Sequence, residues 1–310
     1  MTTSLAPSVT AVTQRDPKGL KFMSIVGAQY DKAKLSEEEA QRLNDTPGLA
    51  NFIAEFVKEN RRENKHADEE EESNYEYPLE YQGPKPIEKQ VKAIAEMLGL
   101  DPAQALERVK HLPEFATFVP EKALPYVGWF AGPSDEALKK LFPDIDNAAE
   151  RYCKGIEMAL GKIAESRAFR NWREGQIVPA QLRLNANDVE KLVEIAKAQP
   201  GDILILALQL GRLHRGRSTR RARECFVANE YGLGSLSGAS IALTHPERFV
   251  RSEELDMDLP GDEFDDPGDV ARFARAPRLY FSDDRLKFGS RYVGSTLQYF
   301  GSASGFVPQQ

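Results

Sequence analysis

The residues best suited to chemistry in this chain are six arginines that fall within twelve positions. They are Arg212, Arg215, Arg217, Arg220, Arg221 and Arg223, with His214 among them and no acidic residue before Glu224. Each guanidinium presents a planar fork of N–H donors that matches a carboxylate or a phosphate. We call residues 212–223 the arginine segment, and it is the only strongly cationic stretch of an acidic protein.

A helix over the second half of the arginine segment would gather its cations on one face. Arg217, Arg220 and Arg221 have the i, i+3, i+4 spacing of neighbours on a helix surface. Ser218 suits the N-cap position, where free backbone amides favour an anion. The leading hypothesis is a non-enzymatic binding protein that engages a phosphate-rich ligand or nucleic acid. The expected anion-binding residues are Arg212, Arg215, Arg217, Ser218, Arg220, Arg221 and Arg223.

An acidic stretch further along the chain offers these arginines an internal partner. Residues 253–269 contain nine acidic residues and no basic one. Charge runs of opposite sign often pair within one fold. The second hypothesis is therefore a structural or assembly protein, in which the arginine segment pairs with this stretch of its own or a neighbouring chain. Paired, largely covered arginines would favour it, whereas a free cleft lined by guanidinium forks would favour anion binding.

A second acidic run lies in a segment with the composition of a linker. Residues 68–72 are five consecutive acids, followed by three tyrosines and by prolines up to Pro86. A solvated linker is the usual interpretation of such a run. The sharper alternative is that the acidic and aromatic residues from Asp68 to Tyr81 dock on a protein partner, or on the chain's own arginines.

Two groups of residues are candidates for catalysis, and neither has supporting spacing. Cys225 and His245 are a possible thiol–imidazole pair for a hydrolase, although Cys225 is followed by Phe226 and Val227, as a buried cysteine often is. The candidate carboxylates for a divalent metal are Asp256, Asp258, Asp262 and Glu263. This stretch is not an EF-hand, because proline stands at its fifth and twelfth positions. We therefore expect no cofactor and lean against an enzyme.

Three stretches resemble parts of uncharacterised bacterial proteins. They are residues 213–224, 244–249 and 301–309. The resemblance covers the last third to half of the chain. It implies no known activity, so no functional residue is carried over from it.

Composition limits the compartment and the partners. The net charge of −7 argues against a whole-protein affinity for nucleic acid or anionic membrane, so any polyanion would bind locally. Two cysteines without a CxxC motif fit a reducing compartment. The N-terminus lacks the pattern of a signal peptide, and the longest apolar run is far shorter than the ~20 residues of a membrane span. We expect a cytoplasmic protein that does not bind membranes.

These groups must be positioned by a mixed fold. We expect an α+β protein with a largely helical N-terminal two-thirds and a β-rich C-terminal third. The expected divisions are a flexible tail (1–20), an N-terminal helical segment (21–66), an acidic Pro/Tyr linker (67–86), a helical domain (87–200) and a β-rich domain that carries the arginine-rich helix (201–310).

Capping signals and apolar stripes locate the expected elements. Helices are expected at 47–64, 87–98, 101–111, 147–170, 187–199 and 218–229, with short ones starting at Ser36 and Ser134. Strands are expected at 21–26, 203–208, 240–244, 278–281, 286–288 and 297–300, with a hairpin turn at 282–284. The apolar run 203–208 also fits the first turns of a buried helix.

Overall fold

The computed structural model describes residues 17–46, 48, 49, 52, 53, 65–252 and 254–308. The chain divides into two compact units, Met1–Arg62 and Glu63–Gln310. The first unit contains the helices α1 (Pro17–Ala33) and α2 (Glu37–Asn44). Ser36 starts α2 with the predicted capping box, because its hydroxyl accepts from the Glu39 amide and the Glu39 carboxylate accepts from the Ser36 amide.

One prediction for the first unit is wrong, and two others fall largely outside the described residues. Residues 21–26 lie within α1 and are not a strand, since so short an apolar run does not determine its own period. The predicted tail over 1–20 runs into the same helix, which begins at Pro17, while residues 1–16 lie outside the described residues. The helix predicted over 47–64 also falls largely outside them, although Leu49, Phe52 and Ile53 are helical.

The helices predicted between residues 87 and 200 are confirmed, with small shifts at their ends. They are α4 (Ile87–Leu98), α5 (Ala103–Val109), α6 (Asp135–Leu141), α7 (Ala148–Ser166) and α8 (Val189–Ala198). Gly99 ends α4 in the left-handed conformation, at φ 68°, and the Asn147 side chain caps α7. Asp188 rather than Asn187 occupies the N-cap position of α8, and its side chain makes no capping bond.

A four-stranded antiparallel sheet runs through the second unit in the order β1-β4-β10-β5. Its strands are β1 (Gly128–Pro133), β4 (Ile203–Gln209), β5 (Glu230–Gly232) and β10 (Ser304–Phe306). The strand predicted at 203–208 is confirmed, and its continuous apolar sequence follows from burial on both faces. Leu206 and Leu208 pack with α7 and α10, whereas Ile203 and Ile205 pack with α4.

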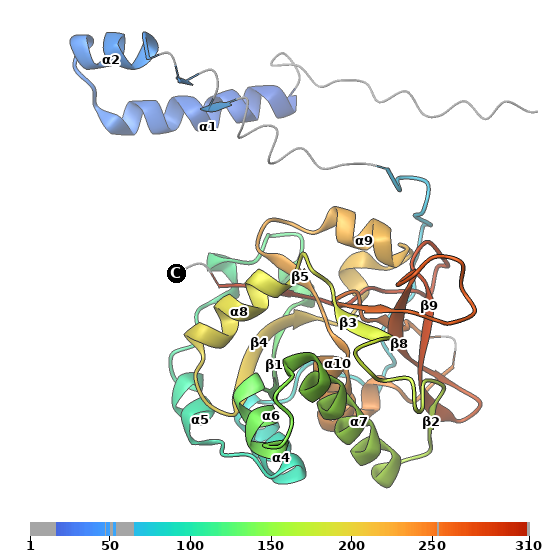
Figure 1. The fold of residues 1–310 in the computed structure, drawn as a ribbon. Coiled ribbons are helices and arrows are strands. Elements are labelled where there is room, and N and C mark those ends of the chain that lie inside the picture. The colour runs from blue at the N-terminus through green and yellow to red at the C-terminus, as the bar shows by residue number, and fades with distance from the viewer. Residues whose placement is uncertain (1–16, 47, 50–51, 54–64, 253, 309–310) are drawn as a thin grey trace, which may run out of the picture. The chain divides into compact units, whose positions relative to one another are not determined.

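This sheet crosses the domain boundary predicted at residue 200. β1 lies before that boundary and β4 lies after it, yet the two strands pair along their whole length. The helix α10 (Ser235–Thr244) packs beside α7 against the sheet, as Figure 1 shows. The strand predicted at 240–244 is wrong because these residues end α10, whose small side chains are buried nearly all round and leave no helical apolar stripe in the sequence.

A second, six-stranded sheet is built around a long hairpin. Its strands are β2 (Phe169–Asn171), β3 (Leu182–Leu184), β6 (Met257–Asp258), β7 (Asp262–Phe264), β8 (Arg275–Ser282) and β9 (Arg285–Tyr292). The predicted turn joins β8 to β9, with Asp283 and Asp284 at positive φ. Residues 297–300 form a turn and not the predicted strand. The fold is thus a mixture of helices and sheets, and the C-terminal third is less purely β than predicted.

The arginine segment connects β4 to a short helix. It begins with a 3₁₀ turn at Arg212–His214 and ends in α9 (Thr219–Cys225). Ser218 caps α9 as predicted, since its hydroxyl accepts from the Arg221 amide at 3.1 Å. The helix predicted over 218–229 is shorter than expected and ends at Cys225.

Candidate functional site

The residues predicted to form a linker are docked on the arginine segment. We call residues 65–76 the acidic strap, and its contacts with the arginine segment the strap interface. The Glu71 amide donates to the Gly216 carbonyl at 2.7 Å, and the Ser218 amide donates to the Glu69 carbonyl at 3.0 Å. These bonds form an antiparallel β-bridge between Glu70 and Arg217, so the strap has a defined register on the segment.

A glycine sets the distance between the two backbones. Gly216 has φ 71°, a left-handed conformation that residues with a side chain rarely adopt. A Cβ placed on Gly216 would lie 2.1 Å from the Glu71 carbonyl oxygen. The strap therefore fits only because this position carries no side chain.

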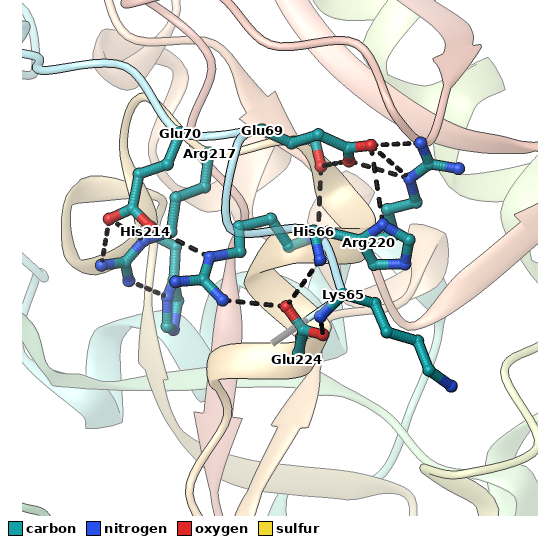
Figure 2. Close-up of polar contacts among 10 residues, drawn as sticks. Lys65, His66, Glu69, Glu70, His214, Arg217, Arg220 and Glu224 are labelled. Carbon is teal, nitrogen blue, oxygen red and sulfur yellow. Dashed lines mark hydrogen bonds and ion pairs between the residues drawn. The ribbon is translucent and has the colours of Figure 1, made fainter. Parts of the chain in front are cut away.

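Carboxylates of the strap hold five of the six arginines. Glu69 accepts from Arg220 Nε at 2.8 Å, and Glu70 binds both Arg217 at 2.8 Å and Arg221 at 3.0 Å. Figure 2 shows Glu70 beside Arg217 and Glu69 beside Arg220. Glu76 binds Arg212 at 2.5 Å and also pairs with Arg215.

The pairs that Glu69 and Glu70 form are ionic at neutral pH. Burial raises the pKa values of Glu69 and Glu70, but hydrogen bonds from the guanidinium groups outweigh it and leave both pKa values below their usual range. The five arginine side chains keep between 15% and 34% of their surface exposed. They are paired and largely covered, which is the arrangement expected of a structural partner and not of a free anion cleft.

Two further anchors hold the ends of the strap. At its start, the Glu224 carboxylate at the end of α9 accepts from the amides of Lys65 and His66. Just after it, the Tyr77 hydroxyl accepts from the amides of Leu210 and Arg212. The strap interface is thus fixed by backbone bonds and an aromatic residue as well as by charge.

Within one chain, the described carboxylates of the acidic stretch 253–269 are not the ionic partners of the arginine segment, and the pairing with a neighbouring chain stays a prediction. These carboxylates pair elsewhere: Asp256 with Arg278 and Arg291, Asp265 with Arg272, Asp266 with Arg173 and Asp269 with Arg275. Arg223 reaches this stretch, where it donates to the backbone carbonyls of Pro260 and Asp262.

A buried polar chain continues inward from the strap. His214 Nδ1 lies 3.1 Å from Arg217 Nη1, and because arginine can only donate, this nitrogen must be the acceptor. His214 Nε2 therefore carries the proton and donates to Glu230 at 2.6 Å. Burial raises the pKa of Glu230, but the bonds from His214, Ser304 and the Val227 amide outweigh it and keep that pKa below its usual range.

Cys225 and His245 do not form a working thiol–imidazole pair. His245 is buried, its Nε2 accepts from the Lys85 amide at 2.9 Å, and its Nδ1 then donates to the Thr244 hydroxyl at 2.8 Å. Burial also lowers the pKa of His245 to about 4. Both ring nitrogens are committed, so neither is left to activate the Cys225 thiol.

Protein groups contact all four carboxylates predicted as metal ligands, although neither buried oxygen of Asp258 accepts a hydrogen bond among the described residues. Asp256 and Asp258 contact Arg291, Asp262 accepts from the Tyr152 hydroxyl and the Ser235 amide, and Glu263 accepts from Arg183. Burial raises the pKa values of Asp258 and Asp262 to about 6. Within the described part of the chain, no group of three or more His, Cys, Asp or Glu residues could hold a metal ion.

Sequence reasoning missed three residues that organise this site. Gly216, His214 and Glu230 act through backbone conformation and burial, and no spacing rule reveals either. The match between the acids at 68–72 and the arginines at 217–221 was visible in the sequence, but as one of several possible pairings.

No protein-family model, curated protein or solved structure matches this chain. The resemblance to uncharacterised bacterial proteins stays a prediction, as does the cytoplasmic compartment. None of the helices in the described residues is both long and apolar enough to span a membrane.

Proposed function

We propose that this chain is a non-enzymatic assembly protein. The acidic strap and the arginine segment form its reversible contact, within one copy or between neighbouring copies. The observation that carries this proposal is the fit of the Glu71 carbonyl over Gly216, with ion pairs on both sides of it. A merely solvated acidic linker would have no such register.

The energetics suit a contact that can open. Exposed or half-exposed ion pairs contribute about 0–1 kcal/mol each and are screened by salt. The strap adds backbone hydrogen bonds and the Tyr77 anchor to these pairs. Several weak, specific interactions of this kind make an interface that is occupied at physiological salt but exchanges without unfolding the protein.

The first unit offers a surface for a protein partner. Leu20, Ile25 and Phe52 expose 58%, 55% and 67% of their surface. Helix α1 alone exposes six large apolar side chains, which are Leu20, Phe22, Met23, Ile25, Val26 and Tyr30. Contiguous exposed apolar surface is typical of protein–protein contacts. An assembly protein needs such a surface in addition to the strap interface.

A charge-exchange experiment tests this proposal. Glu69→Arg and Arg220→Glu should each increase protease cleavage within residues 65–76, because like charges then face one another. Both changes in one chain should restore protection if the contact lies within one copy. Mixing the two single variants should restore it only if the contact joins neighbouring copies. An exchange of the exposed α7 pair Lys162 and Glu165 is the matched control. Unchanged cleavage in both single variants would contradict the proposal.

Polyanion binding is the second candidate. It is favoured by the geometry of Arg217 and Arg220, whose guanidinium forks hold carboxylates of the strap in an arrangement that phosphate oxygens also fit. On this account a nucleic acid would compete with the strap. Glu69→Gln/Glu70→Gln should then reveal salt-sensitive binding of short RNA or DNA in fluorescence anisotropy, and Arg217→Ala/Arg220→Ala/Arg221→Ala should abolish it. Absence of binding in the Gln variant would contradict polyanion binding and leave assembly as the remaining candidate function.

A further inference from the structure

A polar pocket lies next to α9 and has no role in the strap interface. It has a volume of about 240 Å³ and is bounded by the start of α8, the end of α9 and the start of β5. Phe226, Val227 and Ala228 form an apolar wall, and the charged residues around it are Asp188, Lys191, Arg223 and Glu230.

The Asp188 carboxyl group has an unused oxygen at this pocket. The side chain is 4% exposed, and its Oδ2 accepts from the Gly232 amide at 3.1 Å. Its Oδ1 has no hydrogen-bond partner among the described residues. This oxygen is not among the fully enclosed side-chain atoms that lack a partner, so it is reachable from the pocket that Asp188 lines. The open oxygen faces a cavity and can accept from a ligand.

Two cations at the same pocket keep unused donors. Arg223 donates from Nε to Pro260 and from Nη2 to Asp262, both at 2.9 Å, and its Nη1 makes no hydrogen bond to the described residues. Lys191 uses one N–H on the Glu230 carbonyl at 2.8 Å and has two others. The Glu230 carboxylate is filled by His214, Ser304 and the Val227 amide and is not available to a ligand.

This arrangement selects a small zwitterion. Two cationic donors complement a carboxylate, and one open carboxylate oxygen complements an ammonium group. A simple anion would lack a group for Asp188, and a metal ion would meet two fixed cations. The volume lies below the roughly 300–1,000 Å³ of pockets for drug-sized ligands, which favours a ligand smaller than a nucleotide. We propose that the pocket binds a free α-amino acid, with its carboxylate on Lys191 and Arg223 and its ammonium group on Asp188.

Titration calorimetry with the full chain tests this inference. The probes are glycine, L-alanine, L-serine and L-aspartate, with propionate and ethylamine as compounds that carry only one of the two charges. At least one amino acid should bind saturably, and the single-charge compounds should bind about tenfold more weakly or worse, as expected when one charged contact is lost. No heat from any amino acid at millimolar concentration, or equal binding of propionate, would overturn the proposal.

Two variants separate binding from folding. Asp188→Asn retains an acceptor for the Gly232 amide but removes the charge. It should weaken amino-acid binding about tenfold relative to the natural chain. Lys191→Met retains the aliphatic stem and should weaken binding of the amino acid in the same way. Glu190→Gln on the exposed side of α8 is the matched control and should bind as the natural chain does. Unaltered binding in both pocket variants would contradict the assignment, whatever the state of the strap.

Discussion

The Glu71 carbonyl oxygen occupies the space that a side chain on Gly216 would need. A Cβ on Gly216 would stand 2.1 Å from that oxygen, and the two residues are also joined by a 2.7 Å hydrogen bond from the Glu71 amide to the Gly216 carbonyl. An acidic run of the chain thus lies in register on its most basic segment. The following predictions concern the consequences of this contact.

Gly216→Ala should release the strap. The left-handed conformation at φ 71° costs about 1–2 kcal/mol for a residue with a side chain, and the added methyl group collides with Glu71. Cleavage within residues 65–76 should rise under limited proteolysis. Gly161→Ala in α7 is the control, because nothing lies within 4 Å of its Cβ and a helical glycine gains about 0.5–1 kcal/mol on this change. Equal protection of the strap in both variants would refute the fit described above.

The Glu69–Arg220 pair should show a small, salt-dependent coupling. A double-mutant cycle with Glu69→Gln and Arg220→Gln should give about 0.2–1 kcal/mol at low salt, the range of partly exposed ion pairs. The coupling should vanish in 1 M salt, where the Debye length is about 3 Å. Chemical denaturation of the four proteins measures it, and a coupling independent of salt would show that charge is not its origin.

His214→Ala should destabilise the second unit far more than the same substitution does at an exposed histidine. The change removes one of the two donors that lie 2.6 Å from the buried Glu230 carboxylate, and leaving a buried acceptor short of a hydrogen bond costs about 1–3 kcal/mol, or more for a charged group. The Ser304 and Val227 donors remain, so the lower end of that range is expected. His111→Ala, at a largely exposed position, should change the unfolding free energy by less than about 0.5 kcal/mol. Thermal and denaturant unfolding measure both variants. Equal losses of stability would contradict a stabilising role for the buried contacts of His214.

Acid should open the strap before it unfolds the second unit. The pKa values of Glu69, Glu70 and Glu224 are lowered from 4.5, so their stabilisation is present above that value and is lost as the pH falls through their lowered values. Asp258 and Asp262 act in the opposite sense, because burial raises their pKa values from 3.8 to about 6 and protonation then favours the folded state. As the pH is lowered, proteolysis should report the release of the strap and circular dichroism the unfolding of the second unit. The two transitions should be separate, with release of the strap first.

Amino-acid binding at the α8–α9 pocket should strengthen as the pH rises through about 6. Burial raises the pKa of Asp188 to about 6, and only the carboxylate form attracts an ammonium group. The other charged groups around Asp188 are Lys191, Arg223 and Glu230. Calorimetry on either side of this pH measures the effect, and stronger binding at the lower pH would contradict the orientation proposed for the ligand.

Capping residues and regular apolar patterns in the sequence predicted most of the helices and strands that have them. Examples are the capping box at Ser36, the left-handed Gly99 that ends α4, and the continuous apolar sequence of the buried strand β4. The helix α10 was missed because Gly238 and its small neighbours are buried on all sides, and a Cβ on Gly238 would lie 2.6 Å from Leu259. Its sequence reflects close packing and not amphipathic periodicity.

The sequence offered the correct partner of the arginine segment only as one alternative, and, for a different reason, the choice could not be made. Two acidic stretches were available, and net charge does not distinguish between them. The choice depends on the backbone conformation of Gly216 and on the register between Glu70 and Arg217, which exist only in the folded chain. The pocket at Asp188 likewise depends on three segments that the fold brings together.

Amide hydrogen exchange at Glu71 and Ser218 tests the central claim most directly. Both amides donate across the strap interface, to Gly216 and Glu69 respectively. In the full chain at physiological salt, both should exchange far more slowly than in a free peptide of the same sequence, and Gly216→Ala should abolish the protection of Glu71. Exchange of Glu71 at the free-peptide rate in the natural chain would show that the strap is not docked on the arginine segment.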